Sequence, residues 1–248
     1  EFIELAKKFD MMAATIQQLI DRQQNLFHSV SHELRSPLAR INCAVELARR
    51  SPDITPKMLD RIESDVQKLD SLVGDLLTYT RLNAEVSIPF SEIDVSEIVE
   101  DIADNASLEG DARKIQVICD LPKDDLIMTG NADLLAHAIE NVVRNALRFS
   151  PDGGKVTIQG GMVSDSSLQI SVQDEGPGIP QEEMAKIFDP FFRGANQATG
   201  SGYGLGLPIT MQAAQHHGGT VHAENILPHG LKITITLPLK PAGKSEKA

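Results

Sequence analysis

A histidine followed by an acidic residue, within a stretch of helical periodicity, is the first candidate for chemistry in this chain. The stretch reads Ser29-Val30-Ser31-His32-Glu33-Leu34-Arg35-Ser36-Pro37-Leu38. Apolar residues around it fit one face of a helix and His32 falls outside that stripe, so its imidazole should face outward. Pro37 cannot donate to the carbonyl of Glu33, and the helix should therefore bend or loosen one turn beyond His32. Alone, an exposed histidine on a helix is usually a solvated surface residue.

A second set of polar residues lies on one predicted helix in the second half of the chain. Asn141, Asn145 and Arg148 occur at i, i+4 and i+7 and would share a face. That face could offer an amide oxygen to a cation and a guanidinium to a phosphate. The apolar residues of the same helix, including Val142, Val143 and Ala146, would face the core.

Two glycine-rich segments follow. In Asp174-Glu175-Gly176-Pro177-Gly178-Ile179, glycines would let the backbone approach a ring, and a buried aspartate could accept from an exocyclic amine, which suggests adenine recognition. An ordinary turn is the alternative for this segment. In Gly200-Ser201-Gly202-Tyr203-Gly204-Leu205-Gly206-Leu207, glycines and free N–H groups at the opening of a helix could cradle phosphates. A long irregular segment precedes it, so it is not the strand-first dinucleotide fingerprint.

The helix that carries His32 should be the first of a helical hairpin. Helical patterning runs from residue 2 to about residue 49, and Ser51-Pro52 marks the turn. The next helix carries a heptad seam of the kind that closes four-helix bundles, formed by Leu59, Ile62, Val66, Leu69, Val73 and Leu76. Two helices cannot bury such seams alone, so we expect a symmetric dimer of hairpins. The alternative is a single hairpin packed on the second domain.

The rest of the chain predicts an α/β sandwich of antiparallel hairpins with helices on one face. The domains are expected at residues 1–18 (signalling helix), 19–84 (hairpin), 85–89 (linker), 90–240 (α/β domain) and 241–248 (disordered tail). A short turn is expected between Gly160-Gly161 and Ser166-Ser167. Strands are expected at 90–95, 115–120, 126–129, 155–159, 168–174, 220–224 and 231–237, and helices at 96–111, 132–149, 181–188 and 205–217.

Composition narrows the functional classes. The 248 residues are 41% hydrophobic and carry a net charge of -12, which argues against a nucleic-acid binder and favours a protein or nucleotide partner. Cys43 and Cys119 fit core thiols in a reducing compartment better than a disulfide. No apolar run approaches the length of a membrane span and no signal peptide is evident, so the sequence itself is expected in the cytosol.

The motifs together resemble a known family. The run from His32 to Leu38 is similar to the phosphoacceptor box of sensor histidine kinases of two-component signalling. The three nucleotide-site segments, with Phe188-Asp189-Pro190-Phe191-Phe192-Arg193, resemble the N box, the two glycine boxes and the F box of the GHKL (Bergerat-type) ATP-binding fold of histidine kinases, gyrase, Hsp90 and MutL. The resemblance covers about residues 26–239, and its details are similar to proteobacterial envelope-stress sensor kinases.

This resemblance implies a site for ATP and Mg²⁺. Asn145 would hold Mg²⁺, Asn141 and Arg148 would contact phosphates, Asp174 would bind adenine, and residues 189–204 would form a mobile lid. The other nucleotide-binding residues would be Phe149, Gly176, Gly178, Ile179, Phe188, Gly202, Gly204, Leu205, Gly206 and Leu207. Two positions depart from the family pattern, because Tyr203 and Ser36 stand where many relatives carry threonine.

Residues 4–12 resemble the second helix of a HAMP module, the relay that follows a transmembrane helix in membrane sensors. This resemblance implies the cytoplasmic portion of an inner-membrane protein, attached to the membrane only through upstream segments that the sequence does not include. An ordinary amphipathic helix is the alternative.

The expected function is a homodimeric histidine kinase that autophosphorylates His32 from Mg-ATP, with Glu33 orienting the ring and taking its proton. The phosphoryl group would pass to an aspartate of a response regulator, and Ser36 would serve a phosphatase activity on that regulator. Hydrolytic GHKL relatives carry glutamate at the position of Asn141, and an amide cannot serve as general base. Hydrolysis of ATP should therefore be poor. A nucleotide-binding scaffold without chemistry and a GHKL-type ATPase are the alternatives.

Overall fold

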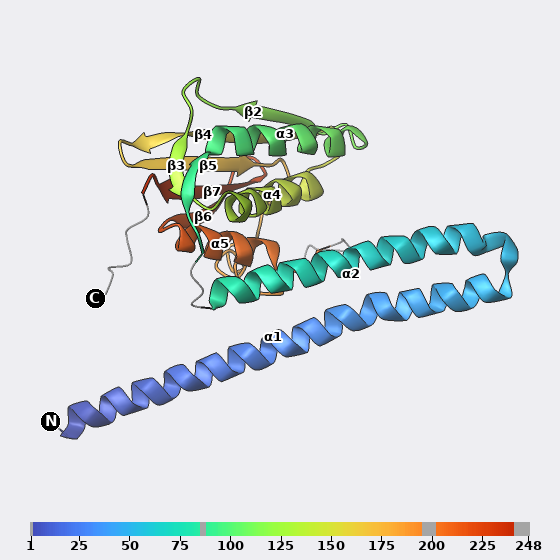
Figure 1. Cartoon of the computed structure of the whole chain (residues 1–248), viewed down its shortest axis with the longest axis horizontal. Coiled ribbons are helices and arrows are strands. Elements are labelled where there is room, and N and C mark those ends of the chain that lie inside the picture. The colour runs from blue at the N-terminus through green and yellow to red at the C-terminus, as the bar shows by residue number, and fades with distance from the viewer. Residues whose placement is uncertain (1, 85–87, 195–201, 241–248) are drawn as a thin grey trace. The chain divides into compact units, whose positions relative to one another are not determined.

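The computed structural model describes residues 2–84, 88–194 and 202–240 (Figure 1). The chain divides into two compact units, Glu1–Gly74 and Asp75–Ala248. The predicted tail, three residues of the predicted linker and the 195–201 part of the predicted lid lie outside the described residues. Within the described ranges, no helix combines the length and the apolarity that crossing a membrane would require.

A helical hairpin begins the chain, as predicted. It consists of α1 (Phe2–Arg50), a short 3-10 turn (Pro52–Ile54) and α2 (Thr55–Asn83). The turn is closed by the hydroxyl of Thr55, which donates to the carbonyl of Ala48 at 3.1 Å. Helix α1 continues through Pro37 without an interruption. A bend at this proline therefore remains a prediction.

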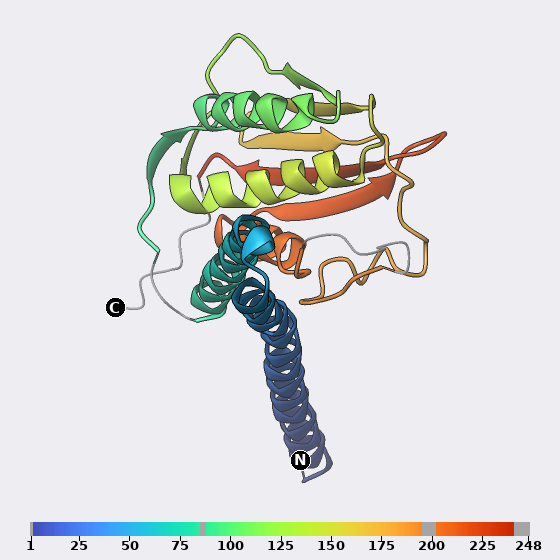
Figure 2. The same cartoon turned by 90° about the vertical axis from the view of Figure 1, so that its right-hand side faces the viewer.

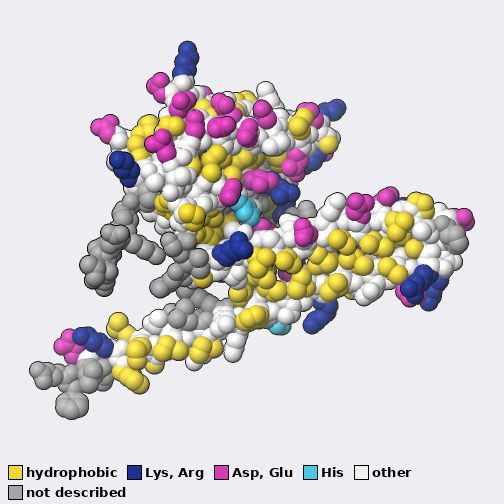
Figure 3. All heavy atoms as spheres, viewed as in Figure 1, with side chains coloured by type: hydrophobic (Ala, Val, Ile, Leu, Met, Phe, Trp, Pro, Cys, Tyr) yellow, Lys and Arg dark blue, Asp and Glu magenta, His cyan; other side chains and the backbone are white. Residues whose placement is uncertain are grey.

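The hairpin buries a different stripe of α2 from the predicted seam. Met58, Asp65 and Leu72 recur every seven residues and are buried. Their seam neighbours Leu59, Val66 and Val73 are 56%, 50% and 45% exposed, and Figure 3 shows hydrophobic side chains along the surface of the hairpin helices. A single chain thus leaves much of the predicted dimer seam in contact with solvent.

The second unit contains a five-stranded sheet of order β2-β4-β5-β7-β6 (Figure 1 and Figure 2). Strands β2 and β4 are parallel and the other neighbours are antiparallel. A separate antiparallel pair is formed by β1 and β3. The strands are β1 (Ser91–Asp94), β2 (Gln116–Asp120), β3 (Ile127–Gly130), β4 (Lys155–Ser164), β5 (Ser167–Gln173), β6 (Thr220–Asn225) and β7 (Leu231–Pro238).

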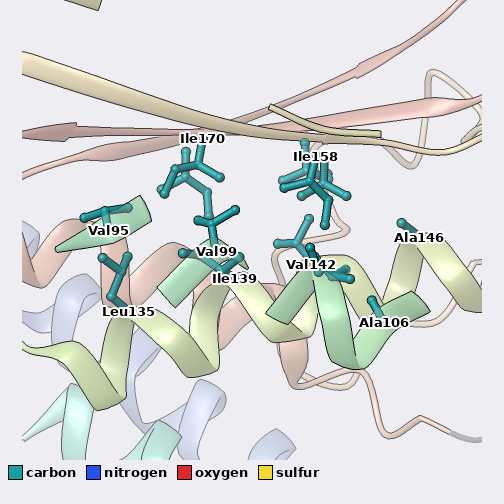
Figure 4. Packing of buried hydrophobic residues seen from close by; sticks show 14 of the residues in the cluster. Val95, Val99, Ala106, Leu135, Ile139, Val142, Ala146, Ile158 and Ile170 are labelled. Atoms are coloured by element: carbon teal, nitrogen blue, oxygen red, sulfur yellow. The ribbon is translucent and has the colours of Figure 1, made fainter. Parts of the chain in front are cut away.

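Helices α3 (Val95–Asp111) and α4 (Ala132–Phe149) cover one face of the sheet, and α5 (Gly206–His216) packs beside α4. Figure 4 shows Ile158 of β4 and Ile170 of β5 pointing from the sheet toward Val99 of α3 and Val142 of α4. These side chains are almost completely buried. The apolar alternation of the strands therefore forms the core predicted for an α/β sandwich.

Three structural predictions are wrong. The predicted helix at 181–188 is absent, and the segment forms successive turns instead. These turns have hydrogen bonds between residues three apart, such as Glu183 N–H to Pro180 O at 2.9 Å. Ile187 of this segment is buried in the core. The turn after β4 lies beyond Ser164 rather than at Gly160 and Gly161, which pair within the strand. A Cβ at Gly160 would lie 2.6 Å from a methyl group of Leu121, so glycine gives that side chain room.

The cysteines are the third correction. Cys43 and Cys119 are free thiols, but both are exposed rather than in the core. Cys43 is exposed although its neighbour Ala44 on α1 is buried, because successive residues of a helix lie about 100° apart around its axis. Cys119 lies on β2, one of the two edge strands of the five-stranded sheet.

Candidate active site

Helix α4 presents the predicted polar face. The Asn131 side chain caps its start by accepting from the Leu134 N–H at 2.9 Å. Val142 and Val143 are buried, whereas Asn141 and Asn145 are partly exposed. Both residues therefore lie on the polar side of the helix, and the amide oxygen of Asn145 is the kind of hard ligand that fits Mg²⁺.

The start of α5 lies directly against Asn141. A Cβ at Gly206 would be 3.2 Å from Asn141 Oδ1, a tight contact that a larger residue could make only if the Asn141 side chain shifted. The two helices are held together by the buried Thr210, whose hydroxyl lies within hydrogen-bond distance of the carbonyls of Ala138 (2.9 Å) and Gly206 (3.0 Å). This contact fixes the distance between the N-box amide and the glycine-rich segment.

Asn141 has a buried donor that the described residues do not satisfy. Its Nδ2 is inaccessible to solvent and has no hydrogen-bond partner among them. A buried polar group without a partner costs about 1–3 kcal/mol. A phosphate oxygen of a bound nucleotide would supply the missing acceptor, so this residue fits the predicted ligand.

Arg148 lies about two turns beyond Asn141 on α4, beside the glycine-rich segment. Its Cζ is 4.7 Å from the centroid of the Phe149 ring, and a Cβ at Gly202 would collide with its Nη1. Burial first, and the charge of Arg193 second, lower the pKa of the Arg148 guanidinium from its ordinary value. A partly desolvated cation in this place is suited to phosphate.

Asp174 follows β5 and is buried. Its Oδ1 accepts from the N–H groups of Gly176 (2.8 Å) and Leu231 (3.2 Å). Burial raises the pKa of this carboxyl, and the two backbone hydrogen bonds oppose that rise. Both donors bind Oδ1 rather than Oδ2, an arrangement that suits recognition of an exocyclic amine by the second oxygen.

The first glycine-rich segment closes around Asp174. A Cβ at Gly176 would lie 2.8 Å from the carbonyl oxygen of Phe149, so this segment contacts the end of α4. Gly178 has a positive φ of 70°, which glycine adopts without strain. The segment predicted to bind adenine therefore lies beside the end of α4, the helix that carries the predicted phosphate contacts Asn141 and Arg148.

Asn225 supports this segment and was not predicted. It lies at the end of β6, accepts from the Ile179 N–H at 2.8 Å and donates to the Ile179 carbonyl at 2.7 Å. Only its position at a strand end, where asparagine often bonds to nearby backbone, could have indicated this role.

The F-box segment meets the second glycine-rich segment through Phe191. Its N–H donates to the Gly204 carbonyl at 2.9 Å, and a Cβ at Gly204 would lie 2.7 Å from the Phe192 carbonyl oxygen. Phe188 and Leu207 instead pack on the domain core, and Leu205 is buried. Gly200 and Ser201 lie outside the described residues. Helix α5 begins without a side-chain cap, so its first N–H groups can bind an anion.

The phosphoacceptor candidate lies on α1 and faces outward, as predicted. The His32 side chain is 73% exposed, and its Nδ1 is 4.0 Å from Oε1 of Glu33. That separation is longer than a hydrogen bond.

Comparisons with known proteins identify the class. Residues 22–85 match the His Kinase A (phospho-acceptor) domain, and residues 130–241 match the family of histidine kinase-, DNA gyrase B- and HSP90-like ATPases. The chain belongs to the sensor histidine kinases, whose two hallmark domains it carries in order. The predicted α/β sandwich of the ATP-binding type is thereby confirmed.

Particular relatives can be named. Sensor histidine kinase CpxA of Escherichia coli (strain K12) is 35% identical over 241 residues, covering 96% of this chain and 52% of CpxA. The histidine-protein kinase/phosphatase MprB of Mycolicibacterium vanbaalenii is 31% identical and is covered to 53%. This chain thus spans about half the length of these relatives. The solved structure of histidine kinase ThkA with the response regulator protein TrrA shares the fold, with a TM-score of 0.68 at 22% identity over 86% of this chain and 60% of that one.

Proposed function

We propose that this chain is the kinase core of a sensor histidine kinase, which autophosphorylates His32 from Mg-ATP and transfers the phosphoryl group to an aspartate of a response regulator. The observation that carries the proposal is the buried, unsatisfied Nδ2 of Asn141 beside the uncapped start of α5. Both could donate to a triphosphate, because Nδ2 has no acceptor among the described residues and α5 has no side-chain cap.

In the nucleotide site, Asp174 Oδ2 accepts from the adenine amine, and Asn141 Nδ2 donates to a phosphate oxygen. Arg148 would offset phosphate charge, and Asn145 would hold Mg²⁺ through its amide oxygen. The metal, when bound, neutralises part of the triphosphate charge. Positioning and electrostatics supply the catalysis, as expected for phosphoryl transfer.

The acceptor is a neutral His32. Its Nδ1 faces Glu33, so Nε2 is the nucleophile and forms the new N–P bond. The bond between the γ-phosphorus and the bridging oxygen breaks, and its electron pair stays on ADP. The Nδ1 proton passes to the Glu33 carboxylate, which also orients the ring.

Asn141 separates this reaction from hydrolysis. An amide cannot take a proton from water, so the site lacks the general base that a glutamate would provide there. The exposed His32 with its acidic neighbour separates the kinase from a mere nucleotide-binding scaffold.

The proposed assembly is a homodimer in which hairpins from two copies bury the half-exposed seam of α2. The proposed partner is a response regulator, and we propose a phosphatase activity on that regulator that uses Ser36. The ThkA structure contains such a regulator, and the name of MprB includes both activities. We also propose that the domains have the bounds predicted from the sequence and that residues 189–204 act as a lid. The HAMP-type segment at residues 4–12 would link the chain to an inner membrane.

Incubation with labelled ATP distinguishes the candidate functions. The kinase yields acid-labile, base-stable phosphate on the protein. An ATPase would release free phosphate without labelling the chain, and a scaffold would do neither.

A further inference from the structure

Arg40 joins two residues of the hairpin that are distant in sequence. On α2, Asp65 accepts from Nε at 3.2 and 3.1 Å (Oδ1 and Oδ2) and from Nη2 at 2.9 Å. On α1, the hydroxyl oxygen of Ser36 accepts from Nη1 at 2.8 Å. The Arg40 guanidinium thus links the Ser36 hydroxyl, one turn beyond His32 on α1, to Asp65 on α2.

The anchor of this arrangement is buried. Asp65 is 3% exposed and occupies a position of the heptad stripe that is otherwise apolar. Its hydrogen bond to Arg40, first among the causes, lowers the pKa of the carboxyl, with a smaller contribution from the charge of Lys68 at 3.8 Å. A planar guanidinium held by both oxygens of a buried carboxylate has little freedom to turn.

This contact changes how the Ser36 hydroxyl is used. Serine and threonine inside helices commonly donate to the carbonyl four residues earlier, as Ser31 does to Phe27 at 2.8 Å and Thr15 does to Met11 at 2.8 Å. The oxygen of Ser36 instead accepts from a fixed cation. The side chain is exposed, and its oxygen keeps a second lone pair that can accept from a water molecule.

We propose that Arg40, anchored by Asp65, is a positioning residue that orients the Ser36 hydroxyl for dephosphorylation of the response regulator. This inference rests on the proposed phosphatase function of Ser36, whose hydroxyl oxygen would hold the attacking water by accepting a hydrogen bond from it. Water forms a bond to the phosphorus of the aspartyl phosphate. The bond from phosphorus to the aspartyl oxygen breaks, its electron pair stays on the regulator's carboxylate, and the hydrogens of the water leave with inorganic phosphate.

Arg40 therefore sets the balance between the two activities of the hairpin. Autophosphorylation of His32 uses no water at Ser36, so loss of the guanidinium lowers phosphatase activity and leaves the kinase reaction in place. The effect should appear in kcat of dephosphorylation rather than in the KM for the regulator, because Arg40 contacts Asp65 and Ser36 within the hairpin and orients the hydroxyl that would hold the attacking water.

A double-mutant cycle on the dimeric protein tests this role. The variants are Ser36→Ala, the charge-pair replacement Arg40→Leu with Asp65→Leu, and the combination of all three. Replacing both charges avoids leaving an unpaired buried carboxylate. Release of phosphate from the phosphorylated regulator is measured beside autophosphorylation and the thermal unfolding midpoint. The matched control is Lys68→Met, which leaves the Arg40 contacts intact, and Arg40→Lys serves as a second, milder variant.

Ser36→Ala and the charge-pair replacement should each lower kcat of dephosphorylation by roughly tenfold, the size expected for loss of a charge-assisted hydrogen bond. The triple variant should be no slower than Ser36→Ala alone, and Arg40→Lys should be intermediate. If the effects multiply, or if the Arg40 variants keep the parental kcat while Ser36→Ala lowers it, the role of Arg40 is overturned. If Ser36→Ala itself has the parental rate, the proposed function of Ser36 fails and the role of Arg40 fails with it.

Discussion

The Asn225 side chain forms two hydrogen bonds with the backbone of Ile179, accepting from its N–H at 2.8 Å and donating to its carbonyl at 2.7 Å. The strand β6 thereby holds the segment that carries Asp174, Gly176 and Gly178. A side chain outside every recognised motif thus supports the segment proposed to bind adenine.

Replacing Asn225 by alanine should weaken ATP binding. Loss of two net hydrogen bonds of about 1 kcal/mol each corresponds to an affinity loss of roughly tenfold or somewhat more. Titration with a fluorescent ATP analogue measures it, with His222→Ala on the exposed side of the same strand as control. An unchanged dissociation constant would show that Asn225 does not hold the adenine segment.

Asp174→Asn should separate stability from binding. Burial raises the pKa of the Asp174 carboxyl in the folded protein. The free energy of unfolding therefore falls as pH rises above the ordinary pKa range of a carboxyl, because the folded protein must then bury a charge. Asparagine carries no charge and avoids this loss of stability. The amide oxygen can still accept from Gly176 and Leu231, but its NH₂ cannot accept from adenine.

Thermal unfolding from pH 5 to pH 8 should therefore show a midpoint for Asp174→Asn at or above that of the parent, with the largest gain at high pH. ATP affinity should fall by at least roughly tenfold. The control is Glu175→Gln at the adjacent carboxylate. A parental ATP affinity in Asp174→Asn would remove this residue from the adenine site.

Asn145→Ala should abolish autophosphorylation, because the Mg²⁺-bound triphosphate loses the amide oxygen that positions it. The rate of labelling at several Mg²⁺ concentrations is the measurement. Arg144→Ala is the control, since Arg144 is exposed and lies 3.8 Å from Glu140 on the outer side of α4. Full activity of Asn145→Ala at low Mg²⁺ would contradict the metal assignment.

Val73→Asp should convert the dimer to an unstable monomer, since it buries an unpaired carboxylate in the seam at a cost of several kcal/mol. Light scattering after size exclusion reports the mass. Ser71→Asp places the same charge on the opposite side of α2 and should leave the dimer intact. A stable dimer of Val73→Asp would move the interface to the amino-terminal helix.

Strong periodicity made several elements predictable. Helix α4 has the bounds predicted for residues 132–149, because the Asn131 cap and the apolar positions around Val142 agree. The turns at 181–188 were misassigned as a helix, since Met184, Ile187 and Phe188 also fit a helical spacing of three and four. The spacing of apolar residues alone does not distinguish a helix from a run of single turns that packs on the same core.

The hairpin shows a different limit of sequence reasoning. The heptad pattern found the stripe containing Leu59, Val66 and Val73, but not that Met58, Asp65 and Leu72 are the buried residues of a single chain. A heptad does not say which of two adjacent stripes faces the partner helix. The pairing of Arg40 with Asp65, and of Asn225 with Ile179, depends on contacts between segments far apart in sequence, and no local motif marks them.

The most direct test of the proposed kinase is labelling of the parent protein and of His32→Gln with γ-labelled ATP. The parent should acquire acid-labile, base-stable phosphate, and His32→Gln should acquire none while it keeps its dimeric mass and its ATP affinity. His28→Gln, an exposed histidine one turn earlier on α1, should label like the parent. Acid-labile phosphate on His32→Gln, or release of free phosphate without labelling of the parent, would contradict the assignment of His32 as the phosphoacceptor.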